Sequence, residues 1–358
     1  MKFIDEFRDK EIAGGLIQRI RNNSSRPIQL MEVCGTHTVS IFRYGIRGLL
    51  PEHIRLLSGP GCPVCVTSNE DIDLAIALSR QKDVVIVTFG DMMKVPGSTS
   101  SLQKEKAEGR DIRIIYSSLE ALKIAKEHPD RKVILLAIGF ETTSPTIAVA
   151  ILRAKNENLH NLFFLNSQKR VPPALLALLQ TKRIKIDGLI LPGHVSTIIG
   201  TIPYQFIARE FGRPAVITGF EPLDILQGIW MLVKQIEENR ATIEVQYRRV
   251  VHEEGNPIAL SKIGEVFEKD ESRWRGLGVI PDTGYRFKES YKEMDVRNFE
   301  VDVEPSREHP ECVCGEVLQA IKTPLECRLF KRVCHPENPI GPCMVSIEGT
   351  CHTYFKFS

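Results

Sequence analysis

The residues of this chain best suited to chemistry are its nine cysteines, which fall into two groups. Three of them, Cys34, Cys62 and Cys65, lie in the first 65 residues, and the other six crowd into the last 47. An odd number of cysteines in a chain that opens without a secretory signal favours metal or redox chemistry over a framework of structural disulfides.

The first group lies in two loops that each follow an apolar run, Cys34-Gly35-Thr36-His37 and Gly59-Pro60-Gly61-Cys62-Pro63-Val64-Cys65. Two sulfurs at C-x2-C spacing can close a small disulfide reversibly, which predicts a redox dithiol. Ser68 and Asp71 predict a helix that begins near Asn69, and its positive end would favour thiolate at both sulfurs. Two other interpretations stay open: Cys34 and His37 join one of these thiols on a single metal, or the three cysteines are simply buried at strand ends.

The second group lies among prolines and glycines in the C-terminal tail and consists of Cys312, Cys314, Cys327, Cys334, Cys343 and Cys351. Soft thiolates in a loop-rich segment can hold zinc or an iron–sulfur cluster. Zinc ribbons usually carry two C-x2-C knuckles, and the tail has none, which favours a cluster. A cluster needs four ligands, and spacing alone does not select them from six cysteines.

Short apolar runs alternate with helical patterns along the first 250 residues. This alternation predicts α/β architecture with mainly parallel sheets covered on both faces. The expected strands are Ile28–Val33, Ile54–Leu57, Val84–Phe89, Ile112–Tyr116, Val133–Ile138, Leu162–Leu165, Leu189–Leu191 and Ala215–Thr218. We expect two similar doubly wound domains facing across a cleft, at residues 1–136 and 137–250, and a smaller cysteine-rich region at 251–358. Its first part, 252–310, is expected to be a connector and smaller layer with only a short helical pattern around Ile263–Phe267.

Several turns after these strands are candidates for the lining of the cleft. Gly139-Phe140-Glu141-Thr142 and Gly219-Phe220-Glu221 share the pattern of strand, Gly-Phe-Glu and helix, although a Glu in the first turn of any helix is favoured by its dipole. Asp91 and His194 lie in loops of the same character, rich in Gly and Pro. His194 taken alone is better explained as a loop or packing histidine, because a site needs named partners.

The composition excludes several classes of function. Lys and Arg number 47 against 45 Asp and Glu, with no long run of one sign, so no nucleic-acid footprint is indicated. The apolar runs are far shorter than a membrane span, and the charged start from Met1 to Arg8 does not look like a signal peptide. We therefore expect a cytoplasmic protein, monomeric on its own, that pairs with a small partner.

The motifs together resemble a known family, the hydrogenase maturation factor HypD, from about Met31 to the C-terminus. The resemblance rests on Cys34-Gly35-Thr36-His37-Thr38, Gly59-Pro60-Gly61-Cys62-Pro63-Val64-Cys65, Phe89-Gly90-Asp91-Met92-Met93-Lys94-Val95-Pro96-Gly97, Gly139-Phe140-Glu141-Thr142-Thr143-Ser144-Pro145 and Leu191-Pro192-Gly193-His194-Val195-Ser196. It implies two similar α/β domains and a third region with a [4Fe–4S] cluster. It also implies a scaffold and redox role in assembling the Fe(CN)2CO centre of [NiFe]-hydrogenase, with a HypC-type chaperone and a HypE-type cyanide donor.

The resemblance also implies roles for individual residues. The family's cluster pattern, C-x14-C-x6-C-x16-C, fits Cys312, Cys327, Cys334 and Cys351, with Cys314 as an alternate ligand. Cys34 would bind the transient Fe(II) that carries cyanide and carbon monoxide, with His37 as its helper. Cys62 and Cys65 would form the redox pair, and Asp91, Glu141, Thr142 and His194 would line the cleft.

Two functions from other classes remain as alternatives. A stand-alone thiol–disulfide oxidoreductase would use the C-x2-C dithiol, fed by an iron–sulfur cluster, and would need neither Cys34 nor His37. A structural interaction protein would contain zinc as its only metal, without iron or acid-labile sulfide.

Overall fold

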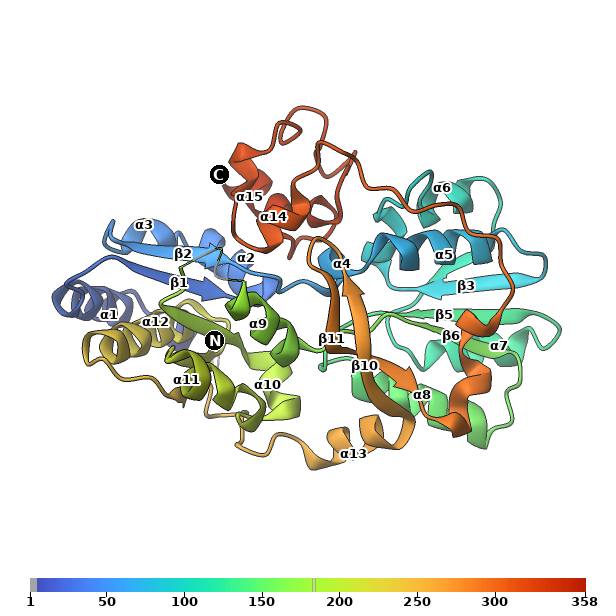
Figure 1. The fold of residues 1–358 in the computed structure, drawn as a ribbon, viewed down its shortest axis with the longest axis horizontal. Coiled ribbons are helices and arrows are strands. Elements are labelled where there is room, and N and C mark those ends of the chain that lie inside the picture. The colour runs from blue at the N-terminus through green and yellow to red at the C-terminus, as the bar shows by residue number, and fades with distance from the viewer. Residues whose placement is uncertain (1–4, 182, 184) are drawn as a thin grey trace.

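A computed structural model describes residues 5–181, 183 and 185–358, so the first half of the expected N-terminal helix, residues 1–4, lies outside it. The chain forms two parallel sheets, an antiparallel hairpin between them and a C-terminal cysteine-rich region (Figure 1). The expected α/β fold class is therefore confirmed. No helix of these described ranges is long and apolar enough to cross a membrane.

The strands are β1 (Ile28–Glu32), β2 (Ile54–Ser58), β3 (Val84–Thr88), β4 (Ile112–Ile114), β5 (Lys132–Ala137), β6 (Leu162–Asn166), β7 (Gly188–Pro192), β8 (Ala215–Thr218), β9 (Ile243–Val245), β10 (Phe267–Trp274) and β11 (Gly278–Phe287). The α-helices are α1 (Lys10–Asn23), α2 (Gly35–Arg43), α3 (Ile46–Leu49), α4 (Pro63–Val66), α5 (Asn69–Ser79), α6 (Leu102–Ala107), α7 (Glu120–Glu127), α8 (Ser144–Asn156), α9 (Val171–Gln180), α10 (Gly193–Ile199), α11 (Gln205–Phe211), α12 (Pro222–Glu237), α13 (Pro257–Val266), α14 (Cys314–Leu318) and α15 (Thr350–Phe357).

The first sheet has the strand order β2-β1-β7-β8-β9, and all its pairs are parallel. Alternate residues of its strands point to opposite faces, so Ile190 and Val216 pack under α1 and α12 while Leu189 and Ile217 face the centre of the molecule. Every residue of β7 is buried, as expected of a parallel strand covered on both sides.

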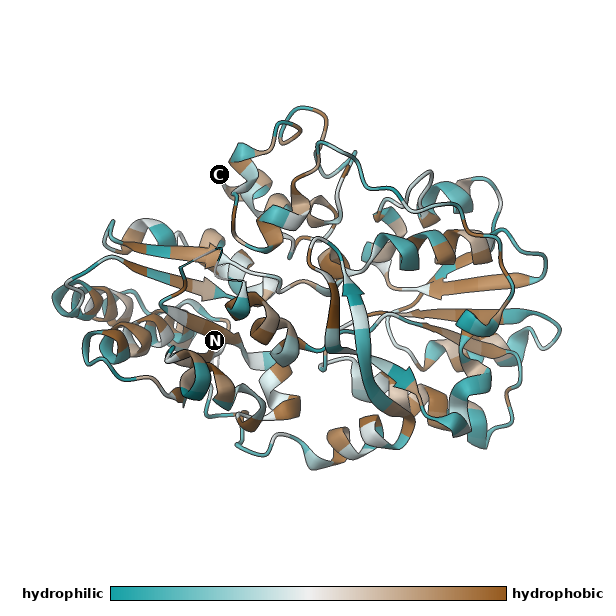
Figure 2. Ribbon diagram, in the orientation of Figure 1, coloured by the Kyte–Doolittle hydropathy of each residue, from teal (hydrophilic) through white to brown (hydrophobic). Residues whose placement is uncertain are grey.

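The second sheet has the order β4-β3-β5-β6 and is also parallel throughout. Val85 and Leu135 pack against α7 and α8 on one face, whereas Ile86 and Ile134 join the same central core as the first sheet. In Figure 2 the strands of the two parallel sheets are mostly hydrophobic, whereas the outer helices mix hydrophobic and hydrophilic residues. One buried core therefore runs through the inner faces of both sheets.

The strands are grouped differently from the division expected at residues 136 and 137. The first sheet takes β1 and β2 from the start of the chain and β7, β8 and β9 from after residue 187, while the second uses the segment between. The expected boundary falls inside β5. The reason is that β7 pairs with β1, a long-range contact that no local pattern records.

The segment expected to be a connector contains a hairpin. Strands β10 and β11 pair in antiparallel fashion over 267–287, beyond the helix expected near Ile263, so the expectation of only one short helix is wrong. Only the two end residues of β10, Phe267 and Trp274, are buried, and the residues between them are polar or charged. The sequence of this strand therefore shows no period of two. In Figure 1 the hairpin stands between the two sheets, whose carboxyl ends point toward each other.

Candidate metal and redox centre

Cys34 lies at the carboxyl end of β1, where it is the N-cap residue of α2. The strands β1 and β2 run in parallel register, with Glu32 opposite Ser58, so the loop after β2 reaches the same edge of the sheet. A side chain at Gly61 would overlap the backbone of Cys34, and the Gly35 N–H donates to the Gly61 carbonyl at 2.9 Å. The glycine at 61 thus lets the two cysteine loops touch.

A buried acidic side chain, that of Glu32, stabilises the backbone at the start of α2. Glu32 accepts hydrogen bonds from the backbone N–H of Cys34 at 3.1 Å and from the Thr38 hydroxyl at 2.5 Å. Burial raises the pKa of Glu32 to about 7, although these donors and the nearby Arg47 oppose the rise. Glu32 therefore ties the end of β1 to the first turn of α2 and fixes the backbone that carries Cys34.

Cys34 is buried, but with 9 % of the residue exposed it is the least buried cysteine of the first group. Burial and the Glu348 carboxylate raise the pKa of Cys34 to about 12, against the opposing effect of the backbone N–H groups of Thr36 and His37. These two donors belong to the N-terminus of α2, so they would stabilise the thiolate once a metal displaces the proton.

Cys62 and Cys65 lie on α4, a single turn between β2 and α5. Cys62 is its N-cap residue, and its sulfur accepts the N–H of Cys65 at 3.3 Å. The helix expected near Asn69 is present as α5, capped by Ser68, but α4 separates it from the two sulfurs. Burial raises the pKa of Cys65 well above its ordinary value, so the expected thiolate character is wrong for this residue.

Two tail cysteines connect this pair to the rest of the second group. The Cys65 thiol donates to the Pro342 carbonyl at 3.9 Å, and the neighbouring Cys62 and Cys343 affect its pKa. The Cys314 thiol donates to the Cys343 sulfur at 2.7 Å, and Cys312 affects the pKa of Cys314. A row of neighbouring cysteines therefore runs from the C-x2-C turn into the C-terminal region.

All six tail cysteines line one small apolar cavity of about 10 Å³, together with side chains such as Leu329 and Phe330. The Cys334 sulfur accepts the N–H of Ile340 at 3.4 Å, and a side chain at Gly341 would crowd the Cys312 sulfur. Such N–H donors and close backbone approach are typical of iron–sulfur sites. The donor set fits a cluster, since thiolates alone supply it.

Residues 5–181, 183 and 185–358 contain no group of three or more His, Cys, Asp or Glu side chains arranged around a single metal ion. This does not conflict with the cysteine-lined cavity, because a four-iron cluster binds each thiolate on a different iron. The same absence of a three-ligand group, in the part of the chain that the structure describes, means that Cys34, His37 and a C-x2-C thiol do not surround one metal position. One interpretation of the sequence required that arrangement.

His37 lies three residues after Cys34 and is fully buried. Its Nε2 lies 3.0 Å from the Gly219 carbonyl and 2.8 Å from the Thr218 hydroxyl. Because a carbonyl only accepts, Nε2 carries the proton, and Nδ1 is left as a buried acceptor without a partner. Burial lowers the pKa of His37 to about 4, so the ring is neutral and Nδ1 is free to accept a hydrogen bond or bind a metal.

The ring of Phe220 lies between two histidines. His37 stacks on it with a centroid distance of 4.8 Å, and His194 stacks on it at 3.9 Å. His194 remains exposed on its other side, and its partial burial lowers its pKa. The structure therefore brings His194 to the same edge of the first sheet as Cys34, although through Phe220 and not by direct contact.

The remaining expected cleft residues belong to the second sheet. Glu141 is buried and accepts the Val171 N–H at 3.0 Å, and burial raises its pKa to about 7. It lies near Tyr204, whose pKa is raised by burial and also by Glu141 and Cys34, so both acidic groups approach the same phenol. Thr142 is half-buried beside it, and Asp91 is exposed at the end of β3.

Some residues of this centre carry no signal in the sequence. Cys343 belongs to no motif of the sequence, and its place near Cys65 brings together segments that are far apart in the chain. Glu348 is not part of any motif in the sequence. Its carboxylate nevertheless accepts a hydrogen bond from the Thr36 hydroxyl at 2.7 Å, and its backbone packs on Gly35. Glu32 interrupts an apolar strand in the sequence. An acidic residue at the end of such a strand is the one signal that could have identified it as part of the site.

Comparisons with known proteins agree on one family. A family model described as "HypD: Hydrogenase formation hypA family" matches residues 11–358. The chain is 45 % identical to the hydrogenase maturation factor HypD2 of Bradyrhizobium diazoefficiens, 44 % identical to HypD of Cupriavidus necator and 42 % identical to HypD of Escherichia coli K12. Each alignment covers 100 % of this chain and 97 %, 97 % and 98 % of these relatives, in that order. The chain therefore belongs to the HypD family of hydrogenase maturation factors.

Proposed function

We propose that this chain is the scaffold on which the Fe(CN)2CO centre of [NiFe]-hydrogenase is assembled, with a HypC-type chaperone and a HypE-type cyanide donor as partners. The observation that carries the proposal is the contact between the two cysteine loops at Gly61. It brings the loop of Cys34, the least buried of the three cysteines, against the loop of the C-x2-C pair, at the carboxyl edge of a parallel sheet where such folds bind their ligands.

Cys34 would bind the incoming iron. Low-spin Fe(II) with cyanide and carbon monoxide is electron-rich and suits a thiolate ligand. The metal would displace the thiol proton, and the N–H groups of Thr36 and His37 would support the resulting thiolate. The free Nδ1 of His37 is suited to accept a hydrogen bond from a ligand or partner at this position.

Cys62 and Cys65 would act as the dithiol of this centre. The Cys62 sulfur accepts the backbone N–H of Cys65 at 3.3 Å, and at C-x2-C spacing the two sulfurs can close a disulfide when two electrons leave and two protons are released. The neighbouring cysteines Cys343 and Cys314 would give these electrons a route that does not cross solvent.

Cys312, Cys327, Cys334 and Cys351 would hold a [4Fe–4S] cluster, with Cys314 as the alternate ligand. When bound, the cluster supplies single electrons at low potential. Leu329 and Phe330 exclude water from this site, which keeps the local dielectric low.

The burial of the dithiol argues against a stand-alone oxidoreductase. Cys65 is 0 % exposed and Cys62 is 3 % exposed, so a disulfide on a folded foreign protein does not reach either sulfur. An exposed, low-pKa attacking thiol is the usual requirement for such exchange.

Complementation in cells tests the proposal. In a host that makes a [NiFe]-hydrogenase but lacks its own copy of this protein, the wild-type chain should restore hydrogenase activity, and Cys34→Ser and Cys62→Ser should not. The variant Arg153→Gln, an exposed side chain on α8, is the matched control. An active Cys34→Ser strain would exclude the scaffold role, and an active Cys62→Ser strain would exclude the dithiol.

A further inference from the structure

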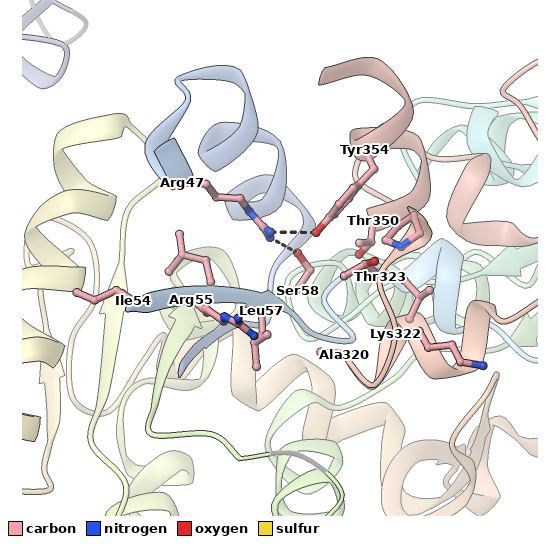
Figure 3. A pocket seen from close by; sticks show the side chains of 13 residues that line it. Arg47, Ile54, Arg55, Leu57, Ser58, Ala320, Lys322, Thr323, Thr350 and Tyr354 are labelled. Atoms are coloured by element: carbon pink, nitrogen blue, oxygen red, sulfur yellow. Dashed lines mark hydrogen bonds between the residues drawn. The ribbon is translucent and has the colours of Figure 1, made fainter. Parts of the chain in front are cut away.

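A cavity of about 320 Å³ lies along the free edge of the first sheet, at β2 (Figure 3). The strand β2 is first in the order β2-β1-β7-β8-β9, so only one of its sides is paired. The opposite wall of the cavity comes from the C-terminal region. Its lining residues on that side are Val317, Ala320, Lys322, Thr323, Pro324, Thr350 and Tyr354.

The cavity meets β2 edge-on. All five residues from Ile54 to Ser58 line it, although successive side chains of a strand point to opposite faces. Figure 3 shows Arg55 and Leu57 on one side of the strand and Ser58 on the other. A space that touches both faces of one strand must lie at its edge.

The backbone groups on this edge belong to Leu56 and Ser58. The Gly59 N–H donates to the Glu32 carbonyl of β1, and the His53 carbonyl accepts from Ile28 of β1. Odd-numbered residues of β2 therefore face β1, and the even-numbered ones face away from it, because backbone groups alternate sides along a strand. The N–H and C=O groups of Leu56 and Ser58 are thus turned toward the cavity.

The charge of the lining is positive throughout. It contains Arg47, Arg55 and Lys322 and no Asp or Glu. Arg47 donates to neutral partners, the Tyr354 hydroxyl at 2.9 Å and the Ser58 hydroxyl at 3.3 Å, and its Nε is buried without a partner. Lys322 is paired with Glu316, which lies outside the lining. The Arg47 guanidinium also lies over the rings of Phe42 and Tyr354, which leaves the exposed Arg55 guanidinium for an anionic ligand.

We propose that this groove receives an extended acidic segment of a partner protein, which adds a strand to the edge of β2. The backbone groups of Leu56 and Ser58 would bond the segment, and the carboxylates on one of its faces would pair with Arg55. Apolar lining residues such as Pro324 would contact the alternate residues. A single edge charge serves to block strand pairing, but a recessed groove lined by cations and, among the described residues, by no acid favours an anion.

The groove leads along β2 toward the cysteine loops. A segment that runs parallel to β2 arrives, at its own carboxyl end, beside Gly59 and the Cys62 loop. The residues that follow it would then lie at the edge that carries Cys34. The inference goes beyond the proposed function, since edge pairing and acidity do not depend on what the cysteines bind.

The test uses a fluorescein-labelled peptide of five residues, alternating glutamate and valine, with blocked ends. We expect saturable binding to the full chain by fluorescence anisotropy, and about tenfold weaker binding to Arg55→Glu, as for loss of a charge-assisted hydrogen bond. Arg153→Glu, an exposed charge reversal on α8, should bind like the wild type. Hydrogen exchange should slow at the amides of Leu56 and Ser58 when the peptide is bound.

Each of the following results would contradict the proposal. Equal binding of the same peptide with lysine in place of glutamate would remove the charge argument. Unchanged binding of a peptide that is N-methylated at alternate residues, or full competition by glutarate without amide protection, would make the groove a site for small anions only. Absence of saturable binding by the acidic peptide would overturn the proposal outright.

Discussion

The two Gly-Phe-Glu turns occupy equivalent places in the two sheets and have different surroundings. Gly139-Phe140-Glu141 follows β5 and precedes α8, and Gly219-Phe220-Glu221 follows β8 and precedes α12. Phe140 is buried and stacks on Trp274 of the hairpin, with centroids 5.9 Å apart. Phe220 is half-buried between His37 and His194. The shared pattern builds the same turn, and the neighbours decide whether the turn supports the core or the site.

The two glutamates differ in the same way. Glu141 is buried, and its carboxylate accepts the N–H of Val171. Glu221 is partly exposed and pairs with Arg8 at 2.6 Å, and it shares a capping box with Asp224 at the start of α12. The turn of the second sheet thus places an acid in the core, whereas the turn of the first sheet places one at the surface.

The largest expected difference between the two turns is in stability. Phe140→Ala should lower the free energy of unfolding by about 3–5 kcal/mol, because it opens a cavity against Trp274. Phe220→Ala should cost roughly half as much or less, since that ring is only partly buried. Urea unfolding of both variants measures this. Equal losses would show that the two turns have the same structural role.

The pH dependence of stability should distinguish the two glutamates. The folded state holds the proton of Glu141 more tightly than the unfolded chain, since burial raises the pKa from an ordinary 4.5 to about 7. Glu141 therefore contributes a loss of stability of about 3 kcal/mol as the pH rises from about 4.5 to 7. Glu141→Gln cannot ionise and should be the more stable protein at pH 8, with the difference fading at pH 4.

The matched variant for this measurement is Glu221→Gln. Its curve of stability against pH should follow that of the wild type in the same window. If Glu141→Gln also follows the wild type, the carboxylate is not desolvated in the folded protein.

The histidine stack should show itself in the titration of His194. Removing the ring in Phe220→Ala exposes the imidazole, so the pKa of His194 should rise toward its ordinary value. NMR of histidine-labelled protein follows this titration directly. Phe140→Leu should leave it unchanged, and a shift in that variant would mean that the two turns are coupled.

The smallest expected effect concerns the ion pair of the surface turn. Arg8→Gln removes the partner of Glu221, and we expect no measurable change in unfolding, because exposed pairs contribute little. A clear destabilisation that disappears in high salt would show that this pair anchors the N-terminus.

Much of the fold could be predicted from the sequence because its strands are local apolar runs. All eight expected strands exist, with ends shifted by one or two residues where a polar residue still pairs, as at Ser58. The grouping of the strands could not be predicted, since β7 joins β1 across the whole second sheet. The hairpin β10–β11 was hidden because its central residues are charged on both faces.

The site was predictable to the extent that its chemistry is local. The C-x2-C turn and the cap at Ser68 are short-range patterns, and both are present. The proximity of Cys65 to Cys343 and the hydrogen bond from Thr36 to Glu348 could not be predicted, because they arise where the tail folds back onto the start of the chain. Burial also reversed the expected pKa direction at Cys65, because desolvation outweighs a single turn of helix.

The most direct test of the account is an infrared spectrum of the protein, purified without oxygen from cells that also make its HypC-type partner. The account predicts bands in the region of metal-bound cyanide and carbonyl for the wild type and for Glu221→Gln. Both sets of bands should vanish in Cys34→Ser while the iron and sulfide of the C-terminal region remain. Bands of wild-type intensity in Cys34→Ser would contradict the claim that this cysteine holds the iron.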